Sequence, residues 1–140
     1  VLVKADYTFI SRLEAENTLS QTVAVWGKGQ LIDNFGYDLF GTPCQDITSE
    51  GVCCFSSKIS TLYPQDQMLV DMNIESYLGV ALYDGEGKVI GLLVALFEDE
   101  IELKDEDMLK DVLLVFSLRA AVELERYTDE QQLKERIQQL

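Results

Sequence analysis

The sequence predicts an α+β domain built on a central antiparallel sheet, and three observations favour this class. An Asp-Gly turn within 84–87 separates two apolar runs, which is the pattern of a β-hairpin. The run after this turn, 88–97, is apolar on both faces, so the sheet around it must be covered on both sides. A long helical pattern with two apolar faces begins at Asp107.

The N-terminal part of the chain predicts two strands followed by a loop. Over 5–14, aromatic and leucine side chains alternate with polar ones, as in a strand with one buried face. A second strand is expected over 22–27. Residues 28–41 contain glycines and loosely patterned aromatic residues, and we interpret them as a loop.

The middle of the chain predicts short elements before the hairpin. Thr42 and Pro43 suit the N-cap and the first position of a short helix that ends near Ile47. A short strand over 51–57 and a short amphipathic helix over 65–72 are expected to follow.

The hairpin itself is expected to pair residues 76–83 with residues 88–97. Because side chains alternate along a strand, the second of these strands should present two apolar faces. One face would carry Ile90, Leu92, Val94 and Leu96, and the other Val89, Leu93, Ala95 and Phe97. This strand should therefore lie in the interior of the sheet.

The C-terminal helix is expected to run at least from Asp107 to Tyr127, and it has two apolar stripes. The first comprises Leu113, Phe116, Ala120, Leu124 and Tyr127, and the second comprises Met108, Val112, Val115 and Val122. One stripe can cover the sheet. The other would stay exposed in a monomer, and so it indicates a partner helix.

The tail, residues 128–140, is polar except for three residues spaced like a short coiled-coil seam: Leu133, Ile137 and Leu140. They are out of phase with the stripe that ends at Tyr127. Residues 128–131 have the pattern of a capping box, which would start a new helix. We expect a continuous helix with a shift of phase; a break at 127–128 is the alternative.

Composition narrows the classes of function. A chain of 140 residues suits one domain, and its net charge of −14 disfavours binding to nucleic acid or to anionic lipid. It has no apolar run of about 18 residues, so no membrane insertion is expected. No signal peptide is recognised, and because the chain begins at Val1 we expect a piece of a longer protein or a trimmed leader.

The few cysteines and the absence of histidine limit the kinds of metal site that the chain could form. The three cysteines are Cys44, Cys53 and Cys54, without a C-x-x-C spacing and without any His. A structural zinc site would need four suitable ligands, so no metal site is expected. Free thiols in a chain without a recognised signal peptide favour the reducing cytoplasm as the location. The cysteines themselves are expected to pack as small buried hydrophobic side chains.

Four short motifs occur in an order that resembles a GAF domain of a bacterial multidomain signalling protein. They are Gly41-Thr42-Pro43-Cys44, Tyr63-Pro64, Glu75-Ser76-Tyr77-Leu78-Gly79 and Gly87-Lys88-Val89-Ile90-Gly91. The resemblance is to GAF domains found beside PAS, diguanylate cyclase (GGDEF) and histidine kinase modules. It covers about 1–126, which leaves 127–140 as a signalling helix or linker towards an output domain.

The resemblance implies a GAF-like, profilin-like fold. Five to six antiparallel strands would carry terminal helices on one face, and short helices and loops would form a pocket on the other. The helix that usually precedes the first strand would here be missing or reduced to residues 1–4.

The resemblance also places a small-molecule pocket between the sheet and residues 30–72. The residues that would line it are Trp26, Phe35, Tyr37, Cys44, Phe55, Tyr63, Met68, Met72 and Tyr77. The alternative is that these side chains only fill a core. Pockets that bind small molecules are mostly apolar, and this composition suits either interpretation.

The known ligands of GAF domains leave the cofactor unidentified. Haem bound through His is excluded, and a bilin on a Cys followed by His is not expected, because the chain has no His. The cyclic-nucleotide class carries Asn-Lys where this chain has Phe97-Glu98. No spacing of carboxylates and thiols selects an iron site.

Three functions follow from the resemblance. The first is a cytoplasmic sensory or relay domain, homodimeric through its terminal helices, that passes its state along the C-terminal helix to a cyclase or kinase. The dimer and signalling residues would be Leu113, Phe116, Leu124, Leu133, Ile137 and Leu140. The second is a structural dimerisation module without a ligand.

The third is a cysteine-based methionine sulfoxide reductase, because Gly51-Val52-Cys53 resembles the motif of one GAF lineage. That lineage places another Cys before the hairpin, where residues 71–75 have none. No basic group is placed to activate Cys53. We therefore expect no enzymatic activity in this domain and no catalytic residue, although the longer protein can be an enzyme.

Overall fold

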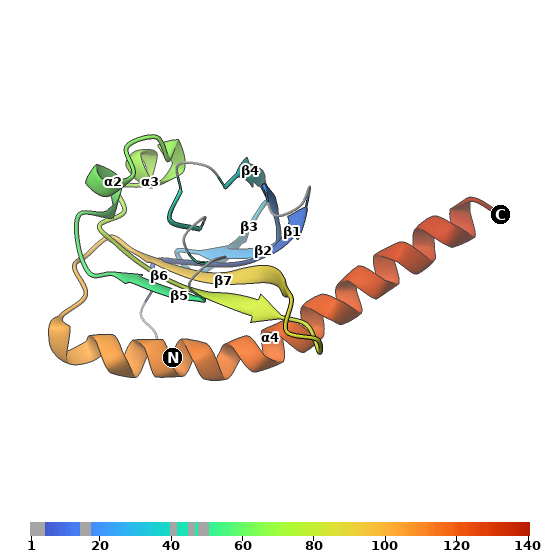
Figure 1. The fold of residues 1–140 in the computed structure, drawn as a ribbon. Helices are drawn as coiled ribbons and strands as arrows, with labels where there is room; N and C mark the ends of the chain where they lie inside the picture. Colours follow the sequence, from blue (N-terminus) through green and yellow to red (C-terminus); the bar gives the residue numbers. More distant parts are fainter. Residues whose placement is uncertain (1–4, 15–17, 40–41, 45–46, 48–50) are drawn as a thin grey trace.

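One antiparallel sheet forms the centre of the molecule in the computed structural model (Figure 1). The structure describes all residues except 1–4, 15–17, 40–41, 45–46 and 48–50. Six of its seven described strands follow the order β3-β2-β1-β7-β6-β5, and the seventh, β4, also pairs with β2. The α+β class expected from the sequence is confirmed.

The N-terminal part of the chain forms more strands than the sequence predicts: the first strand is shorter than the expected 5–14, and the second is longer than the expected 22–27. β1 spans Tyr7–Glu14 and β2 spans Leu19–Gly27. The expected loop over 28–41 is wrong in part, because β3 (Gln30–Ile32) and β4 (Gly36–Asp38) both pair with β2. The chain reverses after β2 through Lys28 and Gly29.

The conformation of that reversal explains why a strand follows it directly. Lys28 and Gly29 both have positive φ, 51° and 81°. Two consecutive residues with positive φ form the type of two-residue turn that suits the twist of a hairpin. Gly27 and Gln30 therefore face each other as the first pair of the β2–β3 ladder. The sequence pattern Lys-Gly hides this turn because only one of its residues is a glycine.

The predicted hairpin is confirmed as β6 (Ser76–Tyr83) and β7 (Val89–Phe97), with β5 (Val52–Phe55) on its outer side. Leu92, Val94 and Leu96 belong to one core cluster, and Leu93, Ala95 and Phe97 belong to the other. The interior strand is thus covered on both faces, as expected from its composition.

The faces predicted for Val89 and Ile90 are wrong. Val89 packs with the cluster of Leu92, and Ile90 packs with the cluster of Leu93. The cause is an irregularity in the β6–β7 pairing: Leu82 faces Gly91 and Tyr83 faces Val89, so Ile90 has no direct partner. A bulge of one residue reverses the face of every side chain beyond it.

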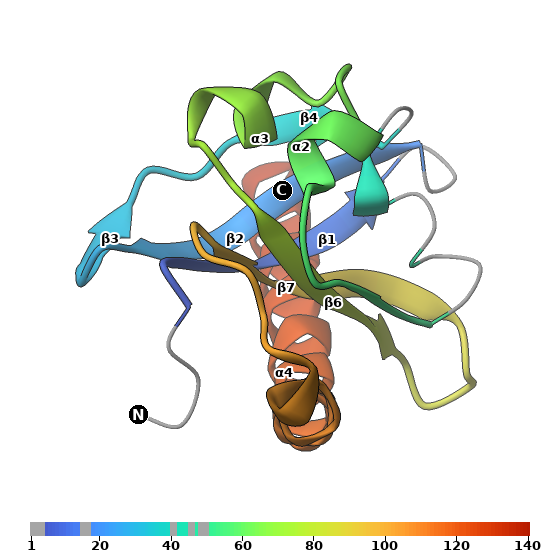
Figure 2. The ribbon, with the colours of Figure 1, turned by 90° about the vertical axis from the view of Figure 1, so that its left-hand side faces the viewer.

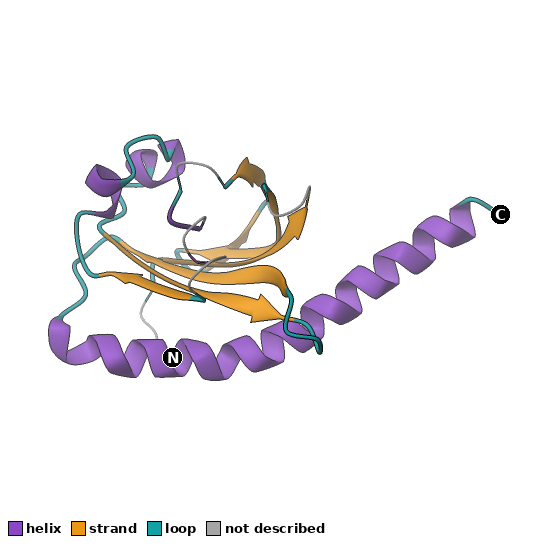
Figure 3. Cartoon of the chain, viewed as in Figure 1, coloured by secondary structure: helices purple, strands orange, loops and turns teal. Residues whose placement is uncertain are grey.

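Short helices lie over one face of the sheet (Figure 3). α2 (Ile59–Leu62) was not expected, and α3 (Gln67–Asp71) lies within the predicted helix over 65–72. Pro43, Cys44 and Ile47 are helical, and the rest of the predicted helix lies outside the described residues. The Thr42 hydroxyl donates to the Leu39 carbonyl at 2.7 Å.

Among the described residues, one helix covers the opposite face of the sheet: α4 (Leu103–Gln138), which packs on β6 and β7. It starts four residues before the predicted Asp107, and it continues through 127–128, so the expected continuity is confirmed. Figure 2 views the molecule almost along α4, with the sheet above it and α2 and α3 above the sheet. In Figure 1 the last turns of α4 extend beyond the sheet.

The described residues contain no helix that is both long enough and apolar enough to cross a lipid bilayer. α4 has the length, but charged residues recur along it.

Candidate functional site

A cavity of about 580 Å³ lies on the face of the sheet opposite to α4. Its floor comes from β1, β2 and β7, and its walls come from β3, β4 and α3. The lining residues are Tyr7, Phe9, Val25, Ile32, Phe35, Gly36, Tyr37, Asp38, Thr42, Gln65, Asp66, Gln67, Met68, Met72 and Leu96. Its size and its aromatic and sulfur-containing lining match those of a small-molecule site.

Three aromatic rings pack against one another at one side of this cavity. The centroids of Phe9 and Phe35 are 6.0 Å apart, those of Phe9 and Tyr37 are 6.1 Å apart, and those of Phe35 and Tyr37 are 5.9 Å apart. Two of the pairs meet edge to face, an arrangement that the ring quadrupoles favour. The rings therefore form a preformed aromatic wall.

Thr22 on β2 fixes the position of this wall. Its hydroxyl accepts a hydrogen bond from the Phe35 N–H at 2.8 Å, and its own N–H donates to the Phe35 carbonyl at 2.9 Å. The hydroxyl also contacts the Asn34 side-chain oxygen at 3.0 Å. A buried threonine thereby attaches the segment between β3 and β4 to the sheet.

Behind the wall, a buried thiol lies between two phenols. The Cys44 Sγ is 3.2 Å from the Tyr37 Oη and 2.9 Å from the Tyr77 Oη. Burial raises the pKa of Cys44 to about 11, and burial likewise raises the pKa values of both tyrosines. All three groups are neutral at physiological pH, so this cluster provides hydrogen bonds rather than a thiolate nucleophile.

Asp66 supplies a largely buried carboxylate to the opposite wall. It is the N-cap of α3 and accepts a hydrogen bond from the Leu69 N–H at 3.4 Å. Burial raises its pKa above the usual aspartate range, and backbone hydrogen bonds from α3 oppose that rise. A second carboxylate, that of Asp38, lines the cavity from β4.

The structure separates the predicted pocket residues into three groups. Phe35, Tyr37, Met68 and Met72 line the cavity. Cys44, Phe55, Tyr63 and Tyr77 belong to the same core cluster but lie behind the lining. Tyr63 and Tyr77 both contact the ring of Phe55, at 5.6 Å and 6.3 Å between centroids.

Trp26 forms the third group on its own, because it faces away from the cavity. Its neighbours on β2, Val25 and Gly27, are directed towards the cavity side: Val25 lines the cavity, and a Cβ on Gly27 would meet Tyr7 and Ile32. Trp26 is therefore on the α4 side of the sheet, where 49% of it is exposed.

Sequence reasoning missed Tyr7, Phe9 and Asp66 as lining residues. Both aromatic residues lie on the buried face that the alternation over 5–14 predicts, but the alternation does not indicate that this face lines the pocket. Asp66 carries a local signal, because an Asp before a short amphipathic helix is a preferred N-cap.

A larger groove of about 850 Å³ runs between the ends of β1 and β7 and the second half of α4. It is lined mainly by polar residues of both charge signs, including Arg12, Lys88, Glu125 and Glu135. Ligand pockets are enclosed and predominantly apolar, so the smaller cavity is the better candidate site. Within the described part of the chain, no cluster of His, Cys, Asp or Glu could hold a metal ion.

A second candidate surface is the outer face of α4. Leu109, Leu113, Ala121 and Leu124 are buried against the sheet, so the predicted dimer residues Leu113 and Leu124 are core residues in this structure. Phe116, also predicted to contact a partner, is 55% exposed. More than half of each of the following side chains is exposed: Met108, Val115, Leu118, Val122, Leu133, Ile137 and Leu140.

These exposed apolar side chains share one face of the helix. Met108, Val115 and Val122 are seven residues apart, and Leu133 follows Val122 by eleven. Seven residues are close to two helical turns and eleven are close to three, so both steps return to the same face. We call the row from Met108 to Leu140 the outer stripe. The tail seam thus continues the second sequence stripe rather than the buried one.

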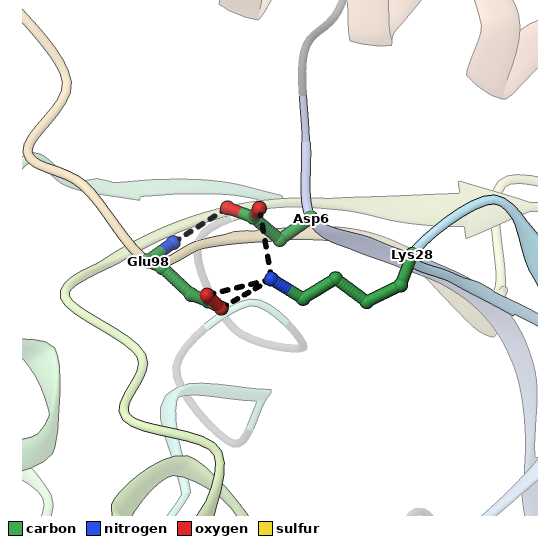
Figure 4. A network of polar contacts seen from close by, with 3 residues as sticks. All are labelled: Asp6, Lys28 and Glu98. Atoms are coloured by element: carbon green, nitrogen blue, oxygen red, sulfur yellow. Dashed lines mark hydrogen bonds and ion pairs between the residues drawn. The ribbon is translucent and has the colours of Figure 1, made fainter.

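An ion-pair network closes the end of the sheet where β1 begins (Figure 4). The Lys28 ammonium donates to Glu98 Oε1 at 2.6 Å and to Asp6 Oδ1 at 3.4 Å, and the Glu98 N–H donates to Asp6 Oδ2 at 2.7 Å. The same ammonium lies 5.8 Å from the centroid of the Tyr7 ring. These contacts join the strand ends of β1, β2 and β7.

Comparison with known proteins gives matches among solved structures only: no family model and no curated protein matches the chain. A domain of a two-component sensor histidine kinase from Sinorhizobium meliloti is 12% identical, with a TM-score of 0.62 over 95% of this chain and 88% of that one. The GAF domain of a two-component sensor histidine kinase from Bacillus halodurans is 20% identical, with a TM-score of 0.60 over 88% and 86%.

A third similar structure is the phycocyanobilin-bound GAF domain of a cyanobacterial phytochrome. It is 13% identical, with a TM-score of 0.59 over 84% of this chain and 74% of that one. At such low identity the three likenesses establish the fold, which is the sheet-and-helix arrangement of GAF domains.

Proposed function

We propose that this chain, which has the fold of GAF domains, is a sensory or relay domain of a signalling protein and performs no chemistry of its own. One observation carries the proposal: an apolar cavity and a projecting helix lie on opposite faces of the same sheet. The similar structures from two sensor histidine kinases and a phytochrome support it.

β7 gives a physical route between the cavity and α4. Leu96 lines the cavity, whereas the neighbouring Ala95 and Phe97 belong to the cluster packed against α4. Near the other end of β7, a Cβ on Gly91 would touch Leu124 of α4. A ligand that displaces β7 would therefore change the packing of α4. This requires that the ligand bind the displaced conformation of the domain with a different affinity from the original one.

The projecting part of α4 is the proposed output. Beyond Leu124 it leaves the core, and the Arg12 guanidinium over the Tyr127 ring, at 5.9 Å, is a late contact with the sheet. The helix would transmit the state of the domain to a following module, such as a histidine kinase or diguanylate cyclase, in the cytoplasm.

We further propose that two copies of the chain pair along the outer stripe. Its apolar side chains are exposed from Met108 to Val122 and again from Leu133 to Leu140, and such a row needs a partner to be buried. The spacing of its members keeps them on one face, which a parallel pair of helices can use as a seam. A homodimer would place the two tails side by side.

Changing Val115 and Val122 together to Glu is expected to dissociate this dimer. Both are exposed in the single chain, so folding should be retained, whereas the dimer would have to bury unpaired carboxylates. We expect the dimer dissociation constant in analytical ultracentrifugation to rise by at least about a hundredfold. Truncation after Tyr127 should weaken the dimer less, because it removes only the tail of the stripe.

Val70→Glu is the matched control for the dimer experiment. Val70 is an exposed valine on α3, away from the outer stripe, so the same substitution there should leave the mass in solution unchanged. A wild-type chain that sediments as a monomer, or a double variant that keeps the wild-type dimer, would contradict the proposed interface.

The three methionines allow the sensory function to be tested in one spectrum. Met68 and Met72 line the cavity, and Met108 lies on the outer stripe. With ¹³C-labelled methionine methyl groups, small compounds of varied charge can be titrated against the dimeric chain. We expect some compounds to shift the Met68 and Met72 signals, and the same compounds to shift Met108 at saturation.

The outcomes separate the competing functions. Shifts confined to Met68 and Met72 would show binding without relay. A stable dimer in which no compound shifts these signals would favour the structural module. Methionine sulfoxide reduction that is lost in Cys53→Ser would favour the enzyme, although Cys53 is buried on β5 and does not line the cavity.

A further inference from the structure

The cavity has an unbalanced charge. Among its described lining residues, Asp38 and Asp66 are negative, and none is Lys or Arg. The chain has no His, and of the residues outside the described part only Lys4 is basic. A ligand that enters this cavity meets carboxylates and aromatic rings, without a cationic side chain from the described lining to accept an anionic group.

The basic side chain next to Tyr7, that of Lys28, is already paired with two carboxylates. The Lys28 ammonium lies 5.8 Å from the centroid of the Tyr7 ring, which lines the cavity, but it is bound by Glu98 and Asp6 (Figure 4). The start of α3, which would otherwise favour an anion, is capped by the Asp66 carboxylate. Neither feature therefore offers free positive charge to a ligand.

We propose that this cavity binds small organic cations that carry an apolar or aromatic group, such as substituted ammonium compounds, and rejects anions of the same size. This inference rests on the proposed function, because it assigns a ligand class to the same cavity.

Aromatic rings and a carboxylate together recognise such a cation. The faces of Phe and Tyr rings attract an ammonium group, most strongly where water is excluded, and Tyr7, Phe9, Phe35 and Tyr37 supply four such rings. A largely buried carboxylate gives the cation an ion-pair partner, without which its burial would be costly. The apolar part of the ligand would contact Val25, Met68 and Met72.

The state of Asp66 agrees with this role. Its carboxylate accepts hydrogen bonds from backbone N–H groups of α3, and burial raises the pKa of its carboxyl. A bound cation would stabilise the ionised form. An anion would instead be desolvated beside a carboxylate, which is unfavourable for both groups.

Three probes of similar shape test the charge preference. Benzyltrimethylammonium is a cation, neopentylbenzene is its neutral isostere, and phenylacetate is an aromatic anion. Binding to the full chain would be followed by the Met68 and Met72 methyl signals and by calorimetry. We expect benzyltrimethylammonium to bind about a hundredfold more tightly than phenylacetate.

Asp66→Asn separates the charge from the shape of the site. Asn keeps an N-cap oxygen for α3, so the fold should be retained. We expect the variant to lose about tenfold in affinity for benzyltrimethylammonium and to keep its affinity for neopentylbenzene within about twofold. The matched control is Asp71→Asn, at an exposed position of α3 outside the cavity, which should change neither affinity.

Two results would overturn the inference while leaving the ligand-binding function intact. One is phenylacetate or neopentylbenzene shifting Met68 and Met72 at concentrations where the cation does not. The other is cation binding that is unaffected by Asp66→Asn. If none of the probes shifts these signals, the cationic class is overturned, and the wider compound set described above decides whether the cavity binds ligands at all.

Discussion

Replacing Tyr77 by alanine is expected to lower the free energy of unfolding by about 3–5 kcal/mol, the usual cost of removing a fully buried aromatic ring. Tyr77 lies on β6 with 1% of its surface exposed, in contact with the ring of Phe55 and the thiol of Cys44. The loss would be a large part of the total stability of a small domain. Urea unfolding at a fixed protein concentration measures it.

Tyr77→Phe is the control that separates the ring from the hydroxyl. It keeps the packing and removes only the hydrogen bond to the Cys44 Sγ, so we expect a loss of about 1 kcal/mol. Because Tyr77 lies behind the cavity lining, both variants should act on stability more than on the choice of ligand. An alanine variant as stable as the wild type would show that Tyr77 is not part of the packed core.

The hairpin was predictable because the apolar composition of its second strand indicates that the strand is buried on both faces. The apolar residues on both faces of β7 left an interior strand as the simplest solution, and the structure places Leu92 and Leu93 in opposite clusters. The bulge at Ile90 was not predictable. Val89 and Ile90 are both apolar β-branched residues, so no pattern marks where the alternation reverses.

A second bulge explains why Trp26 does not reach the cavity. In the β1–β2 pairing Ile10 faces Ala24 and Ser11 faces Thr22, so Val23 is the extra residue. Without Val23 as an extra residue, Trp26 would lie on the same face as Thr22, whose hydroxyl is hydrogen-bonded to Phe35 of the cavity wall. The sequence correctly places Trp26 on a strand that flanks the cavity, but the face on which its side chain lies depends on the unpaired residue Val23.

For α4, the sequence identified two apolar stripes but not which of them meets the sheet. Leu113 and Leu124 are buried, whereas Val115 and Val122 are exposed, although leucine and valine are similarly apolar. The choice depends on how the loop after β7 directs the helix, which is a tertiary effect. The same holds for the cavity. The sequence predicts several of its aromatic residues, but only the folded chain shows that Asp66 lies in its lining.

Gly91→Ala is expected to lower the free energy of unfolding by about 3 kcal/mol or more. A Cβ at this position would overlap the carbonyl oxygen of Ser11 on β1 and the Cδ2 of Leu124 on α4. The leucine side chain can rotate, but the carbonyl belongs to the strand paired with β7, so relief requires the β1–β7 ladder to open. Thermal and urea unfolding would both report the loss.

Gly85→Ala provides the control for this prediction, because a Cβ there would meet nothing within 4 Å and its φ is not in the left-handed region. It changes the same residue type in the β6–β7 connection and should alter stability by less than about 0.5 kcal/mol. If Gly91→Ala proves as mild as Gly85→Ala, the close approach of β1, β7 and α4 is wrong. The proposed route from the cavity through β7 to the helix would then lose its tightest contact.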